Sequence, residues 1–132
     1  MTTDNAGWVA AEYASARAFA PTLNRLVEVI EAAGMRIFAR IDHAAGAREV
    51  GLAMPPATLL IYGHPKGGTP IMLAAPRAAL ELPLRVLVRE DADGRTRISF
   101  HAIAPLLREV GVPEELATRL EPAQHVLLEA LK

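Results

Sequence analysis

The sequence predicts an α+β domain in which helices pack on one face of a β-sheet. Residues 22–33 repeat apolar side chains with the period of a helix, and residues 35–42 alternate apolar and polar side chains as a strand does. Residues 82–101 have the pattern of two strands joined by a tight turn. The order of strand, helix, strands and closing helices indicates this fold class.

The composition is that of one folded domain. The chain has 132 residues, 52% apolar and 22% charged, so we expect a single domain over residues 8–132 after a flexible tail at residues 1–7. The absence of cysteine excludes disulfides, thiolate metal sites and cysteine nucleophiles. A formal net charge of −1 and 5% aromatic residues make nucleic acid an unlikely partner. Because no signal-peptide pattern and no apolar run of about 20 residues is visible, we expect a cytoplasmic protein without a membrane segment.

The N-terminal third is expected to contain two strands and two helices. Residues 8–16 form a candidate first strand, and the helix at residues 22–33 should end at Gly34 in the left-handed conformation. The strand at residues 35–42 would place four apolar side chains on one face: Met35, Ile37, Ala39 and Ile41. Asp42 is well placed to cap a short helix that follows.

The middle of the chain predicts a buried strand followed by a helix. Residues 58–62 are almost wholly apolar, so this strand should lie inside the sheet. Thr69 and Pro70 have the residue types of an N-cap and a first helical position, and Pro76 should kink or split the helix that begins there.

The hairpin at residues 82–101 can be placed in register from its pattern alone. Val88 opposite Ile98 aligns the core faces of both strands. Asp91 then faces Arg95 across a three-residue loop, with Gly94 at the left-handed position. The remaining C-terminal residues are expected to be helical.

This register brings like charges together on the other face of the sheet. Arg85 faces His101, and Arg89 faces Arg97. Like charges directly opposite are unfavourable. Either the arginines spread apart into solvent, or acidic groups of a ligand or a second subunit lie between them.

The glycine-rich stretch after the buried strand is a candidate anion site. Lys66, Gly67 and Gly68 precede the predicted helix start at Thr69, where free amides and the helix dipole favour negative charge. Gly63 and Gly68 have the spacing of a P-loop, but Thr69 stands where a P-loop has lysine, so nucleotide hydrolysis is not indicated. The alternative is a tight turn before an ordinary helix cap.

Asp42 and His43 could form an acid/base pair, because histidine exchanges protons near neutral pH. Adjacent side chains usually point apart, however, and capping a helix is a sufficient role for Asp42. The four histidines lack the close spacing of metal ligands, so neither a metal site nor a cofactor is expected: His43, His64, His101 and His125.

The segments "FARIDHAAGAREVGL", "TLLIYGHPKGGTPIMLAAPRAALELPLRVLVRED" and "ISFH" resemble domain-of-unknown-function family 302 over roughly residues 22–112. The resemblance implies a TATA-binding-protein-like fold, a curved antiparallel sheet of about five strands with helices on one face, and a homodimer. It implies no activity. The family's marked residues correspond to Asp42, His43, Pro65, Lys66, Gly68, Thr69, Pro70, Pro83 and Arg85. His64 stands where the family usually has asparagine, and Arg85 where lysine is common.

These observations lead to three functional hypotheses. The first is a dimeric binding module for a small anionic ligand held by His64, Arg85 and the stretch Lys66, Gly67, Gly68 and Thr69. The second is a small enzyme that uses His43 as general acid/base, with the glycine stretch holding an anion. The third is a purely structural dimerisation domain.

Overall fold

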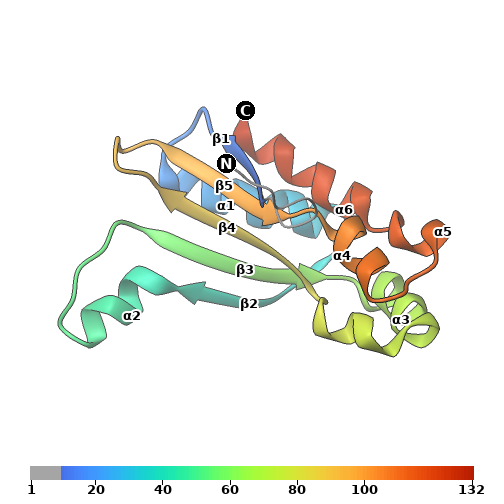
Figure 1. The fold of residues 1–132 in the computed structure, drawn as a ribbon. Coiled ribbons are helices and arrows are strands. Elements are labelled where there is room, and N and C mark those ends of the chain that lie inside the picture. The colour runs from blue at the N-terminus through green and yellow to red at the C-terminus, as the bar shows by residue number, and fades with distance from the viewer. Residues whose placement is uncertain (1–9) are drawn as a thin grey trace, which may run out of the picture.

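A computed structural model describes residues 10–132 and contains one five-stranded antiparallel sheet with the strand order β1-β5-β4-β3-β2 (Figure 1). The strands are β1 (Ala10–Ala14), β2 (Arg36–Asp42), β3 (Ala57–Gly63), β4 (Leu84–Glu90) and β5 (Thr96–His101). The predicted α+β class and its sheet of about five strands are confirmed. The predicted tail at residues 1–7 lies outside the described residues, as do the first two positions of the predicted first strand.

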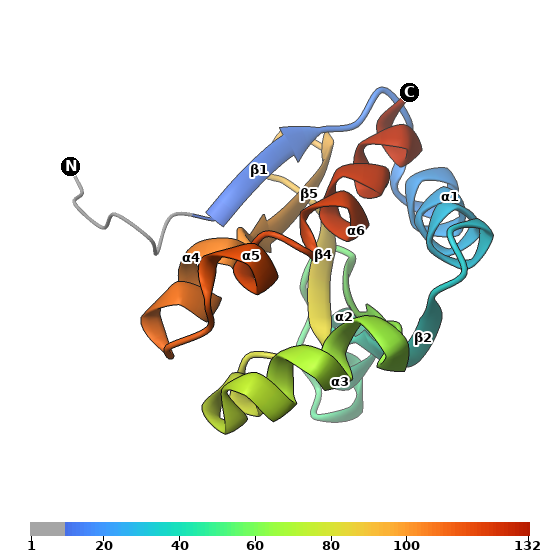
Figure 2. The same cartoon turned by 90° about the vertical axis from the view of Figure 1, so that its right-hand side faces the viewer.

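Six α-helices occur in the described part of the chain: α1 (Phe19–Ala32), α2 (His43–Glu49), α3 (Pro65–Ala74), α4 (Ile103–Glu109), α5 (Glu114–Ala117) and α6 (Glu121–His125). Two 3₁₀-helices follow α3 and α6, at Pro76–Leu80 and Val126–Leu131. The longest helix, α1, contacts β2, β4 and the C-terminal 3₁₀-helix. Figure 2 shows α1 and α6 on the same side of β4, with α3 in front of the strands near the end of β3.

The core lies between these helices and one face of the sheet. Leu60 pairs with Val86, and Val88 pairs with Ile98, and all four side chains are fully buried. Side chains alternate between faces along a strand, so Leu87 and its pairing partners Leu59 and Ser99 point to the opposite face. That face carries the arginine pair expected from the sequence.

The hairpin between β4 and β5 has the predicted register at its closed end. Val88 lies opposite Ile98, and the Asp91 amide donates to the Arg95 carbonyl at 2.7 Å. Gly94 has a φ of 78°, the left-handed value that the three-residue loop requires. A local turn signal and the side-chain alternation were sufficient to place these residues.

The predicted single apolar face of β2 is wrong because the strand contains a bulge. The register shifts between Ile37 and Ala39, so that Ile37 pairs with Tyr62 whereas Ile41 pairs with Leu59. Tyr62 and Leu59 are three residues apart on β3 and point to opposite faces. An extra residue in one strand reverses the faces of all residues after it. Ile41 is consequently 43% exposed.

The predicted ends of several helices are confirmed. Gly34 follows α1 with a φ of 83°, the left-handed conformation that the sequence predicts. The helix that contains Pro70 ends at Ala74, and a separate 3₁₀-helix starts at Pro76, as the position of that proline predicts. Asp42 caps α2 by accepting the Ala45 amide at 2.9 Å.

Candidate functional site

The glycine-rich stretch lies inside a helix, so the predicted helix start at Thr69 is wrong. Helix α3 begins at Pro65, and His64 is its N-cap. The His64 Nδ1 atom accepts the Lys66 amide at 3.1 Å, and the His64 carbonyl accepts the amides of Gly67 and Gly68 at 2.9 and 3.1 Å. These three amides are therefore engaged within the helix and are not presented to an anion.

The residues predicted to share one ligand are divided between two cavities. Arg85 lines a cleft between β4 and β5. His64, Gly68 and Thr69 line a separate apolar cavity. The ligand-binding role of the exposed Lys66 and of Gly67, which line neither cavity, stays a prediction.

Asp42 and His43 are adjacent at the start of α2. Asp42 uses its Oδ1 atom to accept the Ala45 amide, and no hydrogen bond joins the two side chains. His43 is exposed and has no side-chain hydrogen bond within the described residues 10–132. The structure therefore provides the N-cap role of Asp42 and no orienting partner for His43.

The like charges of Arg89 and Arg97 are separated by carboxylates of the same chain. These arginines lie opposite one another as predicted. Arg89 binds Glu12 of β1 at 3.1 Å, and Arg97 binds Asp91 at 2.7 Å. Neither a ligand nor a second subunit is needed to explain this pair. The hydrogen bonds from Ser99 and Arg89 hold the pKa of the Glu12 carboxyl below its usual value.

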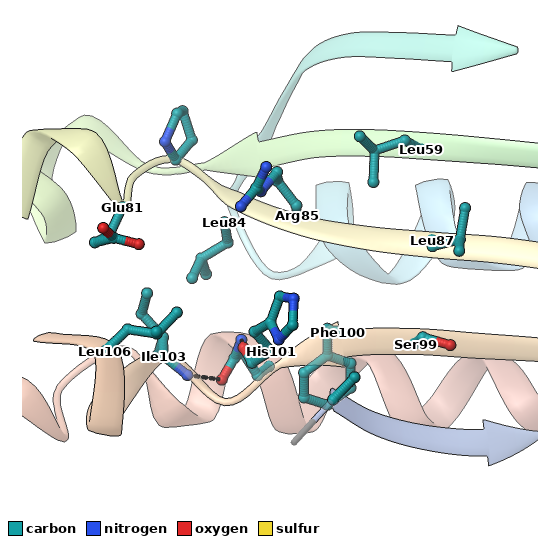
Figure 3. Close-up of a pocket in the computed structure, with 13 residues that line it drawn as sticks. Leu59, Glu81, Leu84, Arg85, Leu87, Ser99, Phe100, His101, Ile103 and Leu106 are labelled. Carbon is teal, nitrogen blue, oxygen red and sulfur yellow. Dashed lines mark hydrogen bonds between the residues drawn. The ribbon is translucent and has the colours of Figure 1, made fainter. Parts of the chain in front are cut away.

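The other predicted pair, Arg85 and His101, faces a gap. The pairing of β4 with β5 ends at Leu87 and Ser99, beyond which the two strands separate (Figure 3). Arg85 and His101 therefore lie on opposite walls of a cleft of about 300 Å³. Arg85 and His101 therefore do not pair directly as predicted, because the cleft lies between them.

The walls of this cleft are mostly apolar, with a few polar groups. Leu84, Phe100 and Ile103 contribute buried apolar side chains. Arg85 and His101 are exposed, and Glu81 also lines the cleft. Such a combination of apolar surface and few polar groups is typical of small-molecule sites.

Gln124 of α6 holds the open end of the cleft in place. Its Oε1 atom accepts the Ile103 amide at 3.1 Å, and its Nε2 atom donates to the His101 carbonyl at 2.8 Å. The side chain is buried, with 5% exposure. Sequence reasoning missed this residue, because Gln124 lies between the polar residues Glu121 and His125 and nothing in the local pattern marks its side chain as buried.

The described part of the chain contains no metal-binding arrangement of carboxylates and histidines. Within residues 10–132, no three side chains of histidine, aspartate or glutamate lie close enough together to hold a metal ion. The same residues contain no helix with the length and apolar character that crossing a bilayer requires.

Comparison with known proteins places the chain in a family. The family model described as "Domain of unknown function DUF302" matches residues 11–132. The chain belongs to this family. The crystal structure of an uncharacterized conserved DUF302 protein from Bacillus stearothermophilus has the same fold, with a TM-score of 0.83 and 18% sequence identity. That similarity covers 93% of this chain and 98% of the other.

Curated relatives of this DUF302 chain include two Brucella proteins named "Fluoride-specific ion channel FluC 1". One is from Brucella suis biovar 1 (strain 1330), 35% identical over 107 residues that are 80% of this chain and 42% of the relative. The other, from Brucella abortus biovar 1 (strain 9-941), has the same identity over 107 residues, which are 40% of that relative. The chain thus spans about two fifths of the length of the curated relatives it matches.

Proposed function

We propose that this DUF302 domain is a binding module for a small anionic ligand, and that the ligand occupies the cleft between β4 and β5. One observation carries the proposal: Arg85 has no carboxylate within salt-bridge distance among residues 10–132, whereas Arg89 and Arg97 each have one. A guanidinium group binds carboxylate or phosphate through paired hydrogen bonds. The cleft beside Arg85 leaves room for such a partner.

The opposite wall supports this choice of ligand. The His101 imidazole lines the cleft and is able to donate a hydrogen bond, whereas the Ser99 hydroxyl, which also lines it, donates to Glu12 at 2.8 Å. Glu81 lines the same cleft and would repel a second negative group. The arrangement therefore favours a ligand with one anionic group and an apolar remainder.

A thermal-shift screen with acetate, benzoate, phosphate and fluoride tests the proposal, because a ligand that binds only the folded state raises its melting temperature. Fluoride is included because the two Brucella relatives are named as fluoride channels. We expect an organic monoanion to give the largest shift. Arg85→Gln should abolish it, and Arg95→Gln, which removes the same charge at the exposed tip of the hairpin, should not. Equal shifts in both variants would reject the cleft as the site.

Self-association is a second candidate function, favoured by apolar residues beside the edge strand β2. Val50 and Leu52, which follow α2, are 72% and 66% exposed, and Ile41 and Met54 are each 43% exposed. Grouped exposed apolar side chains mark interaction surfaces. Light scattering should report a dimer that Leu52→Asp converts to a monomer. A monomeric unmodified chain at all concentrations would remove this candidate.

A further inference from the structure

A second cavity, of about 290 Å³, lies beside α3 and is distinct from the Arg85 cleft, with which it shares only the wall formed by Pro83 and Leu84. Six large apolar side chains line it: Met35, Phe38, Met72, Leu82, Leu84 and Leu120. Among the described residues that line it, only His64 and Thr69 carry polar side chains. Two flexible methionines let such a wall adapt to the shape of an apolar ligand.

We propose that this cavity binds a medium-chain monocarboxylate, with the apolar chain inside and the carboxylate at the mouth. The size of the chain follows from the volume. At roughly 30 Å³ for each water-sized group, a space of about 290 Å³ holds about ten of them. A chain of about eight carbon atoms therefore fits inside with its carboxylate outside.

Two glycines, Gly63 of β3 and Gly68 of α3, line the cavity. A Cβ atom at Gly68 would lie 3.6 Å from Leu82 Cδ1 and 3.8 Å from Met72 Cε, which are ordinary contacts. A Cβ atom at Gly63 would lie 3.7 Å from Phe38 Cε2. Neither close contact nor a positive φ demands glycine at these positions. Glycine weakens a helix relative to alanine, so its presence within α3 preserves space at a cost in helix stability.

The positive charge of Arg36, which is not a lining residue but contacts the lining residue Phe38, favours an anionic head group. The Arg36 guanidinium lies over the ring of Phe38, with its Cζ atom 5.6 Å from the ring centroid. Arg36 has no carboxylate within salt-bridge distance in the part of the chain that the structure describes. His64 accepts the Lys66 amide through Nδ1, so in the neutral imidazole Nε2 carries the hydrogen and is able to donate. No aspartate or glutamate is among the described residues that line the cavity.

Titration calorimetry with octanoate tests the inference, with butyrate and 1-octanol as comparison ligands. We expect octanoate to bind at least tenfold more tightly than butyrate, because the shorter butyrate chain leaves most of the apolar cavity surface in contact with water. It should also bind more tightly than 1-octanol, which lacks the charge that Arg36 attracts. Equal affinities for octanoate and butyrate would overturn the inference.

Variants locate the bound octanoate. Gly68→Leu places a side chain in the cavity and should weaken octanoate binding at least tenfold. Gly46→Leu is its matched control, because Gly46 lies in α2 with no atom within 4 Å of its Cβ position. Met72→Trp fills the same cavity from a neighbouring position and serves if Gly68→Leu melts at a lower temperature than the unmodified protein.

The same titration distinguishes binding in this cavity from binding in the Arg85 cleft. Arg85→Gln should leave octanoate binding unchanged. If Arg85→Gln abolishes binding and Gly68→Leu does not, octanoate occupies the Arg85 cleft and the inference is wrong, although the proposed anion site survives. If both cavity-filling variants bind octanoate as the unmodified protein does, the apolar cavity is not its site.

Discussion

Replacement of Gln124 by methionine should destabilise the domain strongly although it preserves side-chain length. The unmodified amide satisfies two backbone groups, the Ile103 N–H at 3.1 Å and the His101 carbonyl at 2.8 Å. Each hydrogen bond contributes about 1 kcal/mol, and a buried donor left without a partner costs about 1–3 kcal/mol. Because Gln124 is only 5% exposed, water cannot readily replace the amide. The expected loss is therefore about 3 kcal/mol in the free energy of unfolding.

Urea unfolding followed by circular dichroism measures this loss, and the melting temperature should fall by roughly 10 °C for a domain of this size. Gln124→Glu provides a second test through its pH dependence. An ionised carboxylate accepts the Ile103 amide but cannot donate to the His101 carbonyl, so folding should raise the pKa of the introduced carboxyl. The variant is then most stable below the unfolded value of about 4.3 and loses stability as the pH rises. A loss below about 0.5 kcal/mol for Gln124→Met would refute the reasoning.

Three further predictions concern the sheet and its packing. Glu12→Gln should flatten the pH dependence of stability below about pH 4.5, because the lowered pKa of Glu12 gives the unmodified protein stability that is lost as the pH falls. Unchanged acid unfolding of the variant would argue against the hydrogen bond between Glu12 and Ser99. Gly94→Ala should cost about 1 kcal/mol in urea unfolding, since Gly94 has a φ of 78°, and a neutral effect would contradict the left-handed turn. Burial raises the pKa of Tyr62, whose hydroxyl donates to the Ala123 carbonyl at 3.0 Å. Tyr62→Phe should therefore cost about 1 kcal/mol at neutral pH and reduce the loss of stability above about pH 10, as alkaline unfolding curves can show.

The parts of the fold that depend on neighbouring residues could be predicted from the sequence. The hairpin register follows from side-chain alternation together with Gly94 in the turn. The Asp42 cap and the break at Pro76 are also local, because each depends on the chemistry of one residue at a helix end.

The start of α3 could not be chosen from local signals because two prolines compete for it. Pro65 and Pro70 both have residues before them that can cap a helix, His64 and Thr69. A threonine is the commoner cap, which favoured the wrong position. The helix instead starts directly after β3 ends at Gly63, and His64 accepts the Lys66 amide. This five-residue difference, from Thr69 to His64 as the cap, places the glycines within α3.

The cleft at Arg85 depends on contacts between residues far apart in the sequence. Apolar alternation predicts continuous pairing of β4 with β5, yet the pairing stops at Leu87 and Ser99. The chain after β5 is held instead by Gln124, which is 23 residues from His101 and 21 from Ile103. The bulge in β2 is likewise a property of pairing and not of that strand's pattern.

An NMR titration of the arginine Nε–Hε resonances tests the central claim most directly. With the monoanion that gives the largest thermal shift, the account predicts that the Arg85 resonance moves and saturates. The Arg97 resonance should move little because its Nε–H already donates to Asp91, and so should that of Arg89, whose guanidinium binds Glu12 through Nη2. A saturating shift in the backbone amides of Lys66 and Gly67, with Arg85 unmoved, would contradict the account.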